Sequence, residues 1–157
     1  MSSPVPDHAH ILFCANDSYV PHIAACIASL LDNSSLSHHH ICIAGRFDDL
    51  DGVEKLRAYL SQCPKLSFEI IPFSPPVEEL PTRQYWTVDM FTRFWVDDFF
   101  STDVDRVLYL DADMIITGDI AALWNSDIEG CLFGAVTIPD AMDWERLGTP
   151  VDKGYFN

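Results

Sequence analysis

The sequence predicts an α/β protein in which a mostly parallel sheet is flanked by helices. Short apolar runs at residues 10–15, 40–44 and 68–71 have the length and the branched side chains of buried strands. Two segments with helical spacing separate these runs. Because strands that alternate with helices are typical of a parallel sheet with covering helices, we expect this fold class.

Two amphipathic helices account for the segments between the strands. The first is expected to begin after the turn and cap formers at 16–18 and to end at 32–35. Its apolar positions at helical spacing are Val20, Ile23, Ala24, Ile27, Leu30 and Leu31. Those of the second helix are Leu50, Val53, Leu56 and Leu60. Each pattern predicts a helix with one buried face.

A stiff loop and an aromatic helix are expected next. Prolines at 72, 75, 76 and 81 predict a loop, since proline neither continues a helix nor donates along a strand. Residues 85–100 are predicted to form a helix on the sheet, with Trp86, Met90, Phe94 and Val96 or Asp97 near one face. Within it, Arg93 either extends its head to solvent or directs its guanidinium at a phosphate or sugar oxygen.

An Asp-x-Asp motif follows a further strand predicted at 107–110. Asp111 and Asp113 are two residues apart, so on an extended chain both carboxylates face one point. Ligands of open α/β sheets bind outside the carboxyl ends of strands. Two like charges held together there cost free energy unless a cation or proton offsets them. The motif therefore predicts a divalent-cation site.

The remaining segments predict structural elements and no functional site. Residues 117–119 predict a turn, 120–124 one or two helical turns and 131–136 a strand, and 140–154 is irregular and polar. The histidine run at 38–40 is interpreted as a solvated loop that leads into a strand. No carboxylate or cysteine has the spacing to this run that a metal site requires.

The charge balance limits the partners. Nine Lys and Arg against 24 Asp and Glu give a formal net charge of −15. This charge argues against DNA or RNA, because both present a negative phosphate backbone. A nucleotide remains compatible, since a metal ion between the Asp-x-Asp carboxylates and a diphosphate separates the negative groups.

Length and termini bear on domain organisation and location. With 157 residues, we expect a tail at 1–9 and one domain, or part of a larger one, at 10–157. The five cysteines occur singly, which is typical of a reducing compartment. The opening residues lack the pattern of a signal peptide, and no apolar run approaches the ~20 residues of a membrane span. We expect a cytoplasmic protein, with peripheral attachment to the inner face of a membrane left open.

Three stretches in combination resemble a known family. Residues 13–19, the aromatic segment with Arg93, and 106–113 followed by 120–124 resemble the retaining glycosyltransferase family 8. This family includes bacterial lipopolysaccharide galactosyl- and glucosyltransferases and the glycogenins. The resemblance implies a GT-A (Rossmann-like) fold and transfer of a hexose, glucose or galactose, from a UDP-sugar. It also implies Mn²⁺ (or Mg²⁺), retention at the anomeric carbon, and a glycan or lipopolysaccharide acceptor.

The resemblance also implies roles for individual residues. Asp111 and Asp113 match the metal ligands, with Asp111 also near the donor ribose. Asn16, Ser18 and Tyr19 match the lining of the uracil pocket, and Arg93 matches an arginine that contacts the donor. The full set of expected donor-binding residues is Cys14, Ala15, Asn16, Ser18, Tyr19, Arg93, Asp111, Ala112, Asp140 and Asn157.

The sequence departs from the family pattern in two places. The well-known galactosyltransferases have Asp where this chain has Asn16 and Asn where it has Ser18. Both differences fall on residues that are expected to recognise the base. Residues 155–157 resemble the start of a strand that continues in the family. Beyond it, the resemblance places a histidine metal ligand and residues near the reacting sugar. We therefore expect an N-terminal portion of the enzyme, with an incomplete sheet.

Two alternatives stand beside the glycosyltransferase. One is a truncated nucleotide-sugar-binding module without turnover. The other is a haloacid-dehalogenase-type phosphatase, which also places Asp-x-Asp after an apolar strand. That motif has Thr two residues after the second Asp and lies near the N-terminus, whereas this chain has Ile115 there, more than a hundred residues into the sequence.

Overall fold

The computed structural model describes residues 7–76 and 88–135. The chain forms two compact units, divided between Asn125 and Ser126, and each is described by itself. In the second unit, the described residues begin with a short turn. There the Glu129 amide donates to the Asp127 carboxylate and the Cys131 amide to the Ile128 carbonyl. The sheet and its helices belong to the first unit.

Four parallel strands form the sheet, in the order β3-β2-β1-β4. The strands are β1 (His8–Asn16), β2 (His38–Arg46), β3 (Leu66–Pro72) and β4 (Leu108–Tyr109). The long β1·β2 ladder pairs His8 with His38 and Asn16 with Arg46. The short β4 pairs with the middle of β1, Ile11 opposite Leu108. The predicted parallel sheet is confirmed, although β1 begins at His8, two residues before the expected start.

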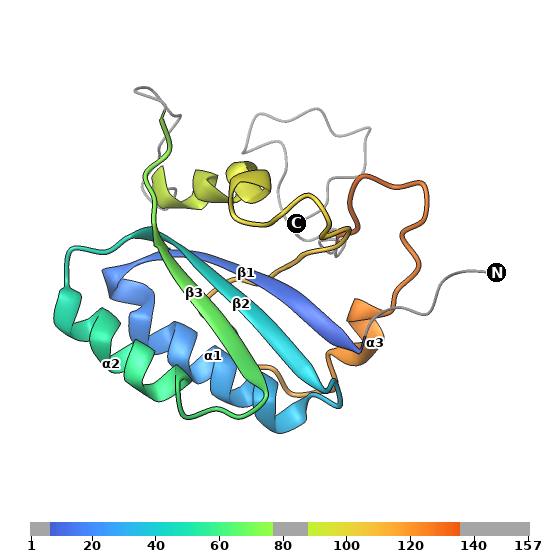
Figure 1. The fold of residues 1–157 in the computed structure, drawn as a ribbon, viewed down its shortest axis with the longest axis horizontal. Coiled ribbons are helices and arrows are strands. Elements are labelled where there is room, and N and C mark those ends of the chain that lie inside the picture. Colours follow the sequence, from blue (N-terminus) through green and yellow to red (C-terminus); the bar gives the residue numbers. More distant parts are fainter. Residues whose placement is uncertain (1–6, 77–87, 136–157) are drawn as a thin grey trace, which may run out of the picture. The chain divides into compact units, whose positions relative to one another are not determined.

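Helices α1 (Val20–Asn33) and α2 (Leu50–Leu60) lie side by side on one face of the sheet (Figure 1). The bounds of α1 agree with its apolar periodicity. Of the expected apolar positions of α2, Leu50 is largely exposed and the other three are buried. A core cluster joins these helices to one face of β1 and β2; its fully buried members include Ile11, Phe13, Ile23, Ile27, Leu30, Ile41 and Ile43. This packing fixes the positions of β1 and β2, and so the place where the chain leaves each strand at its carboxyl end.

The opposite face of the sheet carries the 3₁₀ helix η2 (Val88–Asp98) and the segment after it. Leu12, Cys42 and Ala44 face this side and pack with Phe99. Phe73 contacts Phe99 edge to face, with ring centroids 5.0 Å apart. The second cluster thus holds η2 near the carboxyl ends of the strands.

The aromatic segment differs from its prediction. It is a 3₁₀ helix with a break at Trp95, whose φ and ψ are −103° and 28°, and not a regular α-helix. Met90 and Phe94 are exposed, and the buried positions of η2 are Asp89 and Thr92. The prediction was therefore wrong for Met90 and Phe94, because it assumed α-helical geometry, whereas Val96 packs against the second cluster. Trp86 lies outside the described residues.

The histidine run also differs from its prediction. His38, His39 and His40 are part of β2 and not a solvated loop. The His39 side chain is buried and hydrogen bonds to Ser34 Oγ at 2.9 Å. Alternation along the strand places His38 and His40 on the other face, where both contact Ser67 Oγ at 3.0 Å.

Two further strand predictions need correction. The strand predicted at 107–110 is limited to Leu108 and Tyr109. Residues 131–135, expected to begin another strand, are irregular. The predicted helical turn after the Asp-x-Asp motif is confirmed as α3 (Ala121–Trp124).

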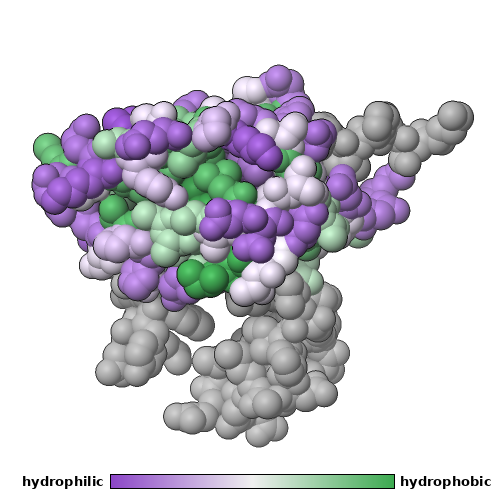
Figure 2. All heavy atoms as spheres, turned by 90° about the horizontal axis from the view of Figure 1, so that it is seen from below, coloured by the Kyte–Doolittle hydropathy of each residue, from purple (hydrophilic) through white to green (hydrophobic). Residues whose placement is uncertain are grey.

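The surface on the side of α1 and α2 is mostly hydrophilic, with hydrophobic residues gathered toward the middle of the view (Figure 2). Exposed ion pairs lie along α2, with Lys55 Nζ 2.5 Å from Asp51 Oδ2 and Arg57 Nε 3.7 Å from Glu54 Oε1. Such pairs are typical of a solvated helix face. Among the described residues, no helix has the length and apolar character needed to cross a membrane.

Candidate donor site at the strand ends

The strand order brings two distant segments together. The chain passes outward from β1 through β2 to β3 and then returns to place β4 on the other side of β1. At such a switch point the connections diverge and leave a crevice at the carboxyl ends of the two strands, which is where ligands bind in open α/β sheets. The residues after β1 and after β4 are therefore neighbours in space.

A cavity of about 210 Å³ occupies this position. Among the predicted site residues, those that line it are Cys14, Ala15, Asn16, Tyr19, Arg93, Asp111, Ala112 and Asp113. Ser18 does not line the cavity; its backbone N–H donates to Asn16 Oδ1 at 3.1 Å. Asp140 and Asn157 lie outside the described residues. The structure thus collects residues from β1, η1 (Asp17–Tyr19), η2 and the segment after β4 around one space.

The Asp-x-Asp motif reaches the cavity by a turn. The predicted extended geometry was wrong, since β4 ends at Tyr109 and a turn includes Ala112 and Asp113. Both carboxylates nevertheless line the cavity. The chain beyond the turn is anchored to α1, because Ile116 donates its N–H to Ser29 Oγ at 2.9 Å and accepts from Asn33 Nδ2 at 3.0 Å.

Arg93, Tyr109 and Asp111 form one connected group. The Arg93 guanidinium carbon lies 4.2 Å from the centre of the Tyr109 ring, and Arg93 Nη2 lies 3.7 Å from Asp111 Oδ1. The Tyr109 hydroxyl donates to the same oxygen at 2.9 Å. Burial raises the pKa of Tyr109 well above its usual range, against the opposite effect of Arg93, so the hydroxyl keeps its proton for this bond. The guanidinium of Arg93 thus rests on protein groups at the cavity that it lines, and its contact with a donor oxygen stays a prediction.

The cavity end formed by β1 has a different chemistry. Asn16 Nδ2 donates to Asp89 Oδ2 at 2.8 Å. Tyr19 is partly exposed and offers its ring to the same cavity. Burial raises the pKa of the Cys14 thiol to about 12, so the free thiol keeps its proton near neutral pH.

Sequence reasoning missed three residues that line the cavity: Asp89, Met90 and Tyr109. Two of them had a local signal. Asp89 lies four residues before Arg93 in a predicted helix, and Tyr109 lies two residues before Asp111 on a predicted strand, so each shares a face with a residue that was singled out. The pairing of Asp89 with Asn16, 73 residues away, had none.

The two carboxylates of the motif fit a hard divalent cation. Mg²⁺ and Mn²⁺ prefer carboxylate, phosphate and water oxygens, which is the donor type that Asp111 and Asp113 present. No group of three His, Cys, Asp or Glu side chains within residues 7–76 and 88–135 is arranged to hold a metal. A cation at these two residues would therefore take its other ligands from outside this set, as a diphosphate can provide.

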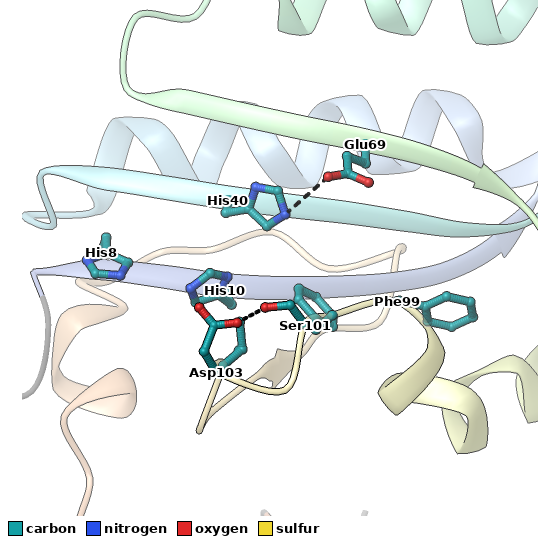
Figure 3. A pocket seen from close by; sticks show the side chains of 9 residues that line it. His8, His10, His40, Glu69, Phe99, Ser101 and Asp103 are labelled. Carbon is teal, nitrogen blue, oxygen red and sulfur yellow. Dashed lines mark hydrogen bonds and ion pairs between the residues drawn. The ribbon is translucent and has the colours of Figure 1, made fainter.

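A second cavity, of about 460 Å³, lies on the η2 side of the sheet (Figure 3). Histidines from β1 and β2 gather there, with ring centroids 5.6 Å apart for His8 and His10 and 5.4 Å for His10 and His40. His40 Nε2 is 4.0 Å from Glu69 Oε1, and Asp103 lies beside His10. These groups do not form a metal-competent set in the part of the chain that the structure describes.

Fold and site together define a parallel α/β protein with an acidic cavity at its switch point. Comparison with known families then makes the assignment specific. The model of glycosyl transferase family 8 matches residues 10–156, and the chain belongs to this family. The assignment excludes the haloacid-dehalogenase alternative, which would require a different family.

Named relatives include enzymes of lipopolysaccharide synthesis. A lipopolysaccharide 1,2-glucosyltransferase of Escherichia coli is 30% identical over 147 residues, which covers 90% of this chain and 43% of that protein. A lipopolysaccharide 1,3-galactosyltransferase of Salmonella typhimurium is 36% identical over 87 residues, 52% of this chain and 26% of that protein. A probable galacturonosyltransferase-like protein of Arabidopsis thaliana is 28% identical over 138 residues. The chain spans less than half the length of these relatives.

Solved structures show the same fold. The galactosyltransferase LgtC, crystallised with donor and acceptor sugar analogues, superimposes with a TM-score of 0.70 at 18% identity, covering 94% of this chain and 55% of that chain. The bifunctional glycosyltransferase WbbM gives a TM-score of 0.64 at 16% identity and covers 82% of this chain. The described sheet and helices therefore have the GT-A fold.

Proposed function

We propose that the protein is a metal-dependent glycosyltransferase that moves a hexose, glucose or galactose, from a UDP-sugar to a glycan or lipopolysaccharide acceptor with retention. The observation that supports this proposal is the cavity at the switch point, in which Asp111 and Asp113 lie with Arg93. Family membership supports the transferase class. The names of the glucosyl- and galactosyltransferase relatives favour these two sugars and a lipopolysaccharide acceptor.

In the proposed reaction, the bond between the sugar and UDP breaks and negative charge develops on the departing diphosphate. A divalent cation, Mn²⁺ or Mg²⁺, held by Asp111 and Asp113 would stabilise that charge. The protein groups keep the site in position. Tyr109 and Arg93 both contact Asp111 Oδ1 and so fix the orientation of this carboxylate. As the acceptor hydroxyl oxygen bonds to the sugar it loses its proton, which the departing diphosphate can take up, so no side chain of the cavity has to act as a strong base.

The remaining lining residues would position the nucleoside. In this proposal the base lies at the β1 end, near Asn16 and Tyr19, with Cys14, Ala15 and Ala112 forming the wall. Ser18, Asp140 and Asn157 stay in the proposed donor set on the family resemblance alone. We further propose a cytoplasmic protein that works at the inner face of a membrane, since lipopolysaccharide acceptors are membrane lipids.

A second candidate function is nucleotide-sugar binding without turnover. It is favoured by one observation: the described residues offer two carboxylates and no third protein ligand for a metal. With fewer protein ligands, a cation would be held more weakly and the leaving group stabilised less.

The experiment measures UDP binding by calorimetry to the whole protein, with Mn²⁺ and with excess chelator. We expect tighter binding with Mn²⁺, because cation and diphosphate supply ligands to each other. Asp113→Asn should remove most of this gain, whereas Asp98→Asn, at an exposed position of η2, should retain it. Equal affinity with Mn²⁺ and with chelator would reject the metal-dependent donor site. Release of free hexose from UDP-glucose or UDP-galactose then separates an enzyme from a binding module.

A further inference from the structure

The base end of the cavity contains a buried carboxylate that the metal does not explain. Asp89 is only 7% exposed, yet it lines the cavity opposite β1. No Lys, Arg or His within the described residues forms an ion pair with it, and its hydrogen-bond donor is the neutral amide of Asn16. Burial of a carboxylate without a cation costs free energy. A further donor from a ligand would offset this cost.

The orientation of Asn16 is fixed by its two hydrogen bonds. Its Oδ1 faces the backbone N–H of Ser18, and its Nδ2 faces the carboxylate of Asp89. A flipped amide would oppose oxygen to oxygen at Asp89 and N–H to N–H at Ser18, so only one orientation satisfies both neighbours. The carbonyl oxygen of Asn16 therefore uses one of its two lone pairs on Ser18, and one hydrogen of its NH₂ group remains.

Asp89 is consequently the better acceptor at this end. An ionised carboxylate has about four lone-pair positions on two oxygens, and Asn16 uses one of them at Oδ2. Together the two side chains present a carboxylate acceptor beside an amide donor. A uracil ring presents the complementary pattern, an N3–H donor between two carbonyl acceptors. Cytosine has a lone pair at N3, which a carboxylate would repel.

We propose that Asp89 is the specificity-determining residue that accepts the N3–H of the donor's uracil, and that Asn16 positions this carboxylate. The inference rests on the proposed function, in which the donor is a UDP-sugar. The exposed ring of Tyr19 in the same cavity offers a surface on which a base stacks, which suits every base and leaves the choice of base to Asp89.

The test measures the affinities of UDP and CDP, each with Mn²⁺, by calorimetry on the whole protein. The parent should prefer UDP. In Asp89→Asn, UDP binding should weaken about tenfold or more, the scale of a hydrogen bond to a charged group, and the preference should largely disappear. Asp98→Asn removes an exposed carboxylate from the same helix and should keep the parental preference.

Asn16→Ala supplies the second variant. It removes the positioning amide but leaves the Asp89 acceptor, so UDP should bind more weakly while it is still preferred over CDP. If Asp89→Asn does not fold, the preference of Asn16→Ala for UDP over CDP alone decides whether the inference holds. Loss of the UDP preference in Asn16→Ala would mean that Asn16 reads the base, and it would overturn the inference.

The outcomes separate this inference from the proposed function. A parent protein that binds neither nucleotide overturns the proposed function and the inference with it. A parent that binds UDP and CDP equally, or an Asp89→Asn variant that keeps the parental preference, overturns the role of Asp89 alone.

Discussion

Arg93 is held in the site by its planar shape as well as by its charge. Its guanidinium lies over the Tyr109 ring at 4.2 Å, its Nε donates to the Met90 carbonyl at 2.9 Å, and Nη2 approaches Asp111. A lysine ammonium cannot make a stacked contact, this hydrogen bond and the ion pair with Asp111 at once. The residue therefore links η2 to the Asp-x-Asp turn in a way that a point charge would not.

We predict that Arg93→Lys lowers the affinity for UDP with Mn²⁺ by about tenfold, because the loss of the stacked guanidinium lets Asp111 move. Calorimetry measures this. Arg57→Lys is the matched control, since Arg57 also lies over an aromatic ring, Phe68 at 5.9 Å, and near a carboxylate, but outside the cavity. Identical UDP affinities in both variants would contradict the role of Arg93.

At the scale of elements, the β1·β2 pairing depends on a glycine near the site. Gly45 lies opposite Ala15, and a Cβ atom at Gly45 would meet the Ala15 carbonyl oxygen at 1.7 Å. This contact is far inside van der Waals distance, and its partner is backbone, which cannot rotate away. Only glycine allows the two strands to come this close beside the cavity wall that Ala15 forms.

We predict that Gly45→Ala lowers the free energy of unfolding. Overpacking typically costs about 1–3 kcal/mol, and we expect a loss at least this large. Denaturant unfolding measures it, and UDP affinity should fall as Ala15 is displaced. Gly118→Ala is the control, because the added Cβ has no atom within 4 Å. Its free energy of unfolding should stay within about 0.5 kcal/mol of the parental value. Comparable losses in both variants would show that the close approach at Gly45 is not the cause.

We expect two histidines of the sheet, His10 and His39, to make the fold sensitive to acid. Burial lowers the pKa of His10 below its ordinary 6.5, and His40 and His8 lower it further against the opposite effect of Asp103 and Asp105. The folded protein thus binds this proton less readily than the unfolded chain. The contribution of neutral His10 to the stability of the fold is therefore complete above pH 6.5. It is lost as the pH falls below that value, because the unfolded chain then takes up the proton more readily.

We predict that the melting temperature falls as the pH is lowered from 7 to about 5 and falls less steeply in His10→Phe, which cannot take up a proton. Burial also lowers the pKa of His39, so part of the acid sensitivity should remain. His22→Phe, at an exposed position of α1, is the control and should match the parent. A pH profile unchanged by His10→Phe would refute this account.

At the scale of the whole molecule, the negative charge sets a condition for donor binding. The formal net charge is −15, and three carboxylates, from Asp89, Asp111 and Asp113, line the cavity with Arg93. A diphosphate that approaches without a cation meets repulsion from the whole protein. Salt screens such repulsion over a distance of about 8–10 Å at 0.10–0.15 M ionic strength.

We predict that UDP binding in the presence of chelator becomes tighter as NaCl is raised from 20 to 300 mM, because screening weakens the repulsion. The same titration with uridine, which has no phosphate, should be nearly independent of salt. Weaker UDP binding at high salt would instead indicate that attraction to Arg93 dominates the metal-free site.

Local patterns in the sequence determined most of the elements. The apolar periodicities of α1, β3 and α3 depend on neighbours a few residues apart, so they could be read without the fold. The same holds for an Asp-x-Asp motif at a strand end. Where a local rule was applied to the wrong geometry, as in the 3₁₀ helix η2, the predicted buried face failed.

The tertiary structure alone decided which strands lie side by side, and so which residues meet at their carboxyl ends. No local pattern specifies that β4 pairs with β1, yet this pairing places Asp111 and Asp113 beside Asn16 and Tyr19. The bond from Asn16 to Asp89 joins residues 73 positions apart, and the burial of His39 depends on the helices that cover β2. Periodicity reports which side of an element is apolar, whereas the identity of the partner across a cavity follows from strand order and packing, which are non-local.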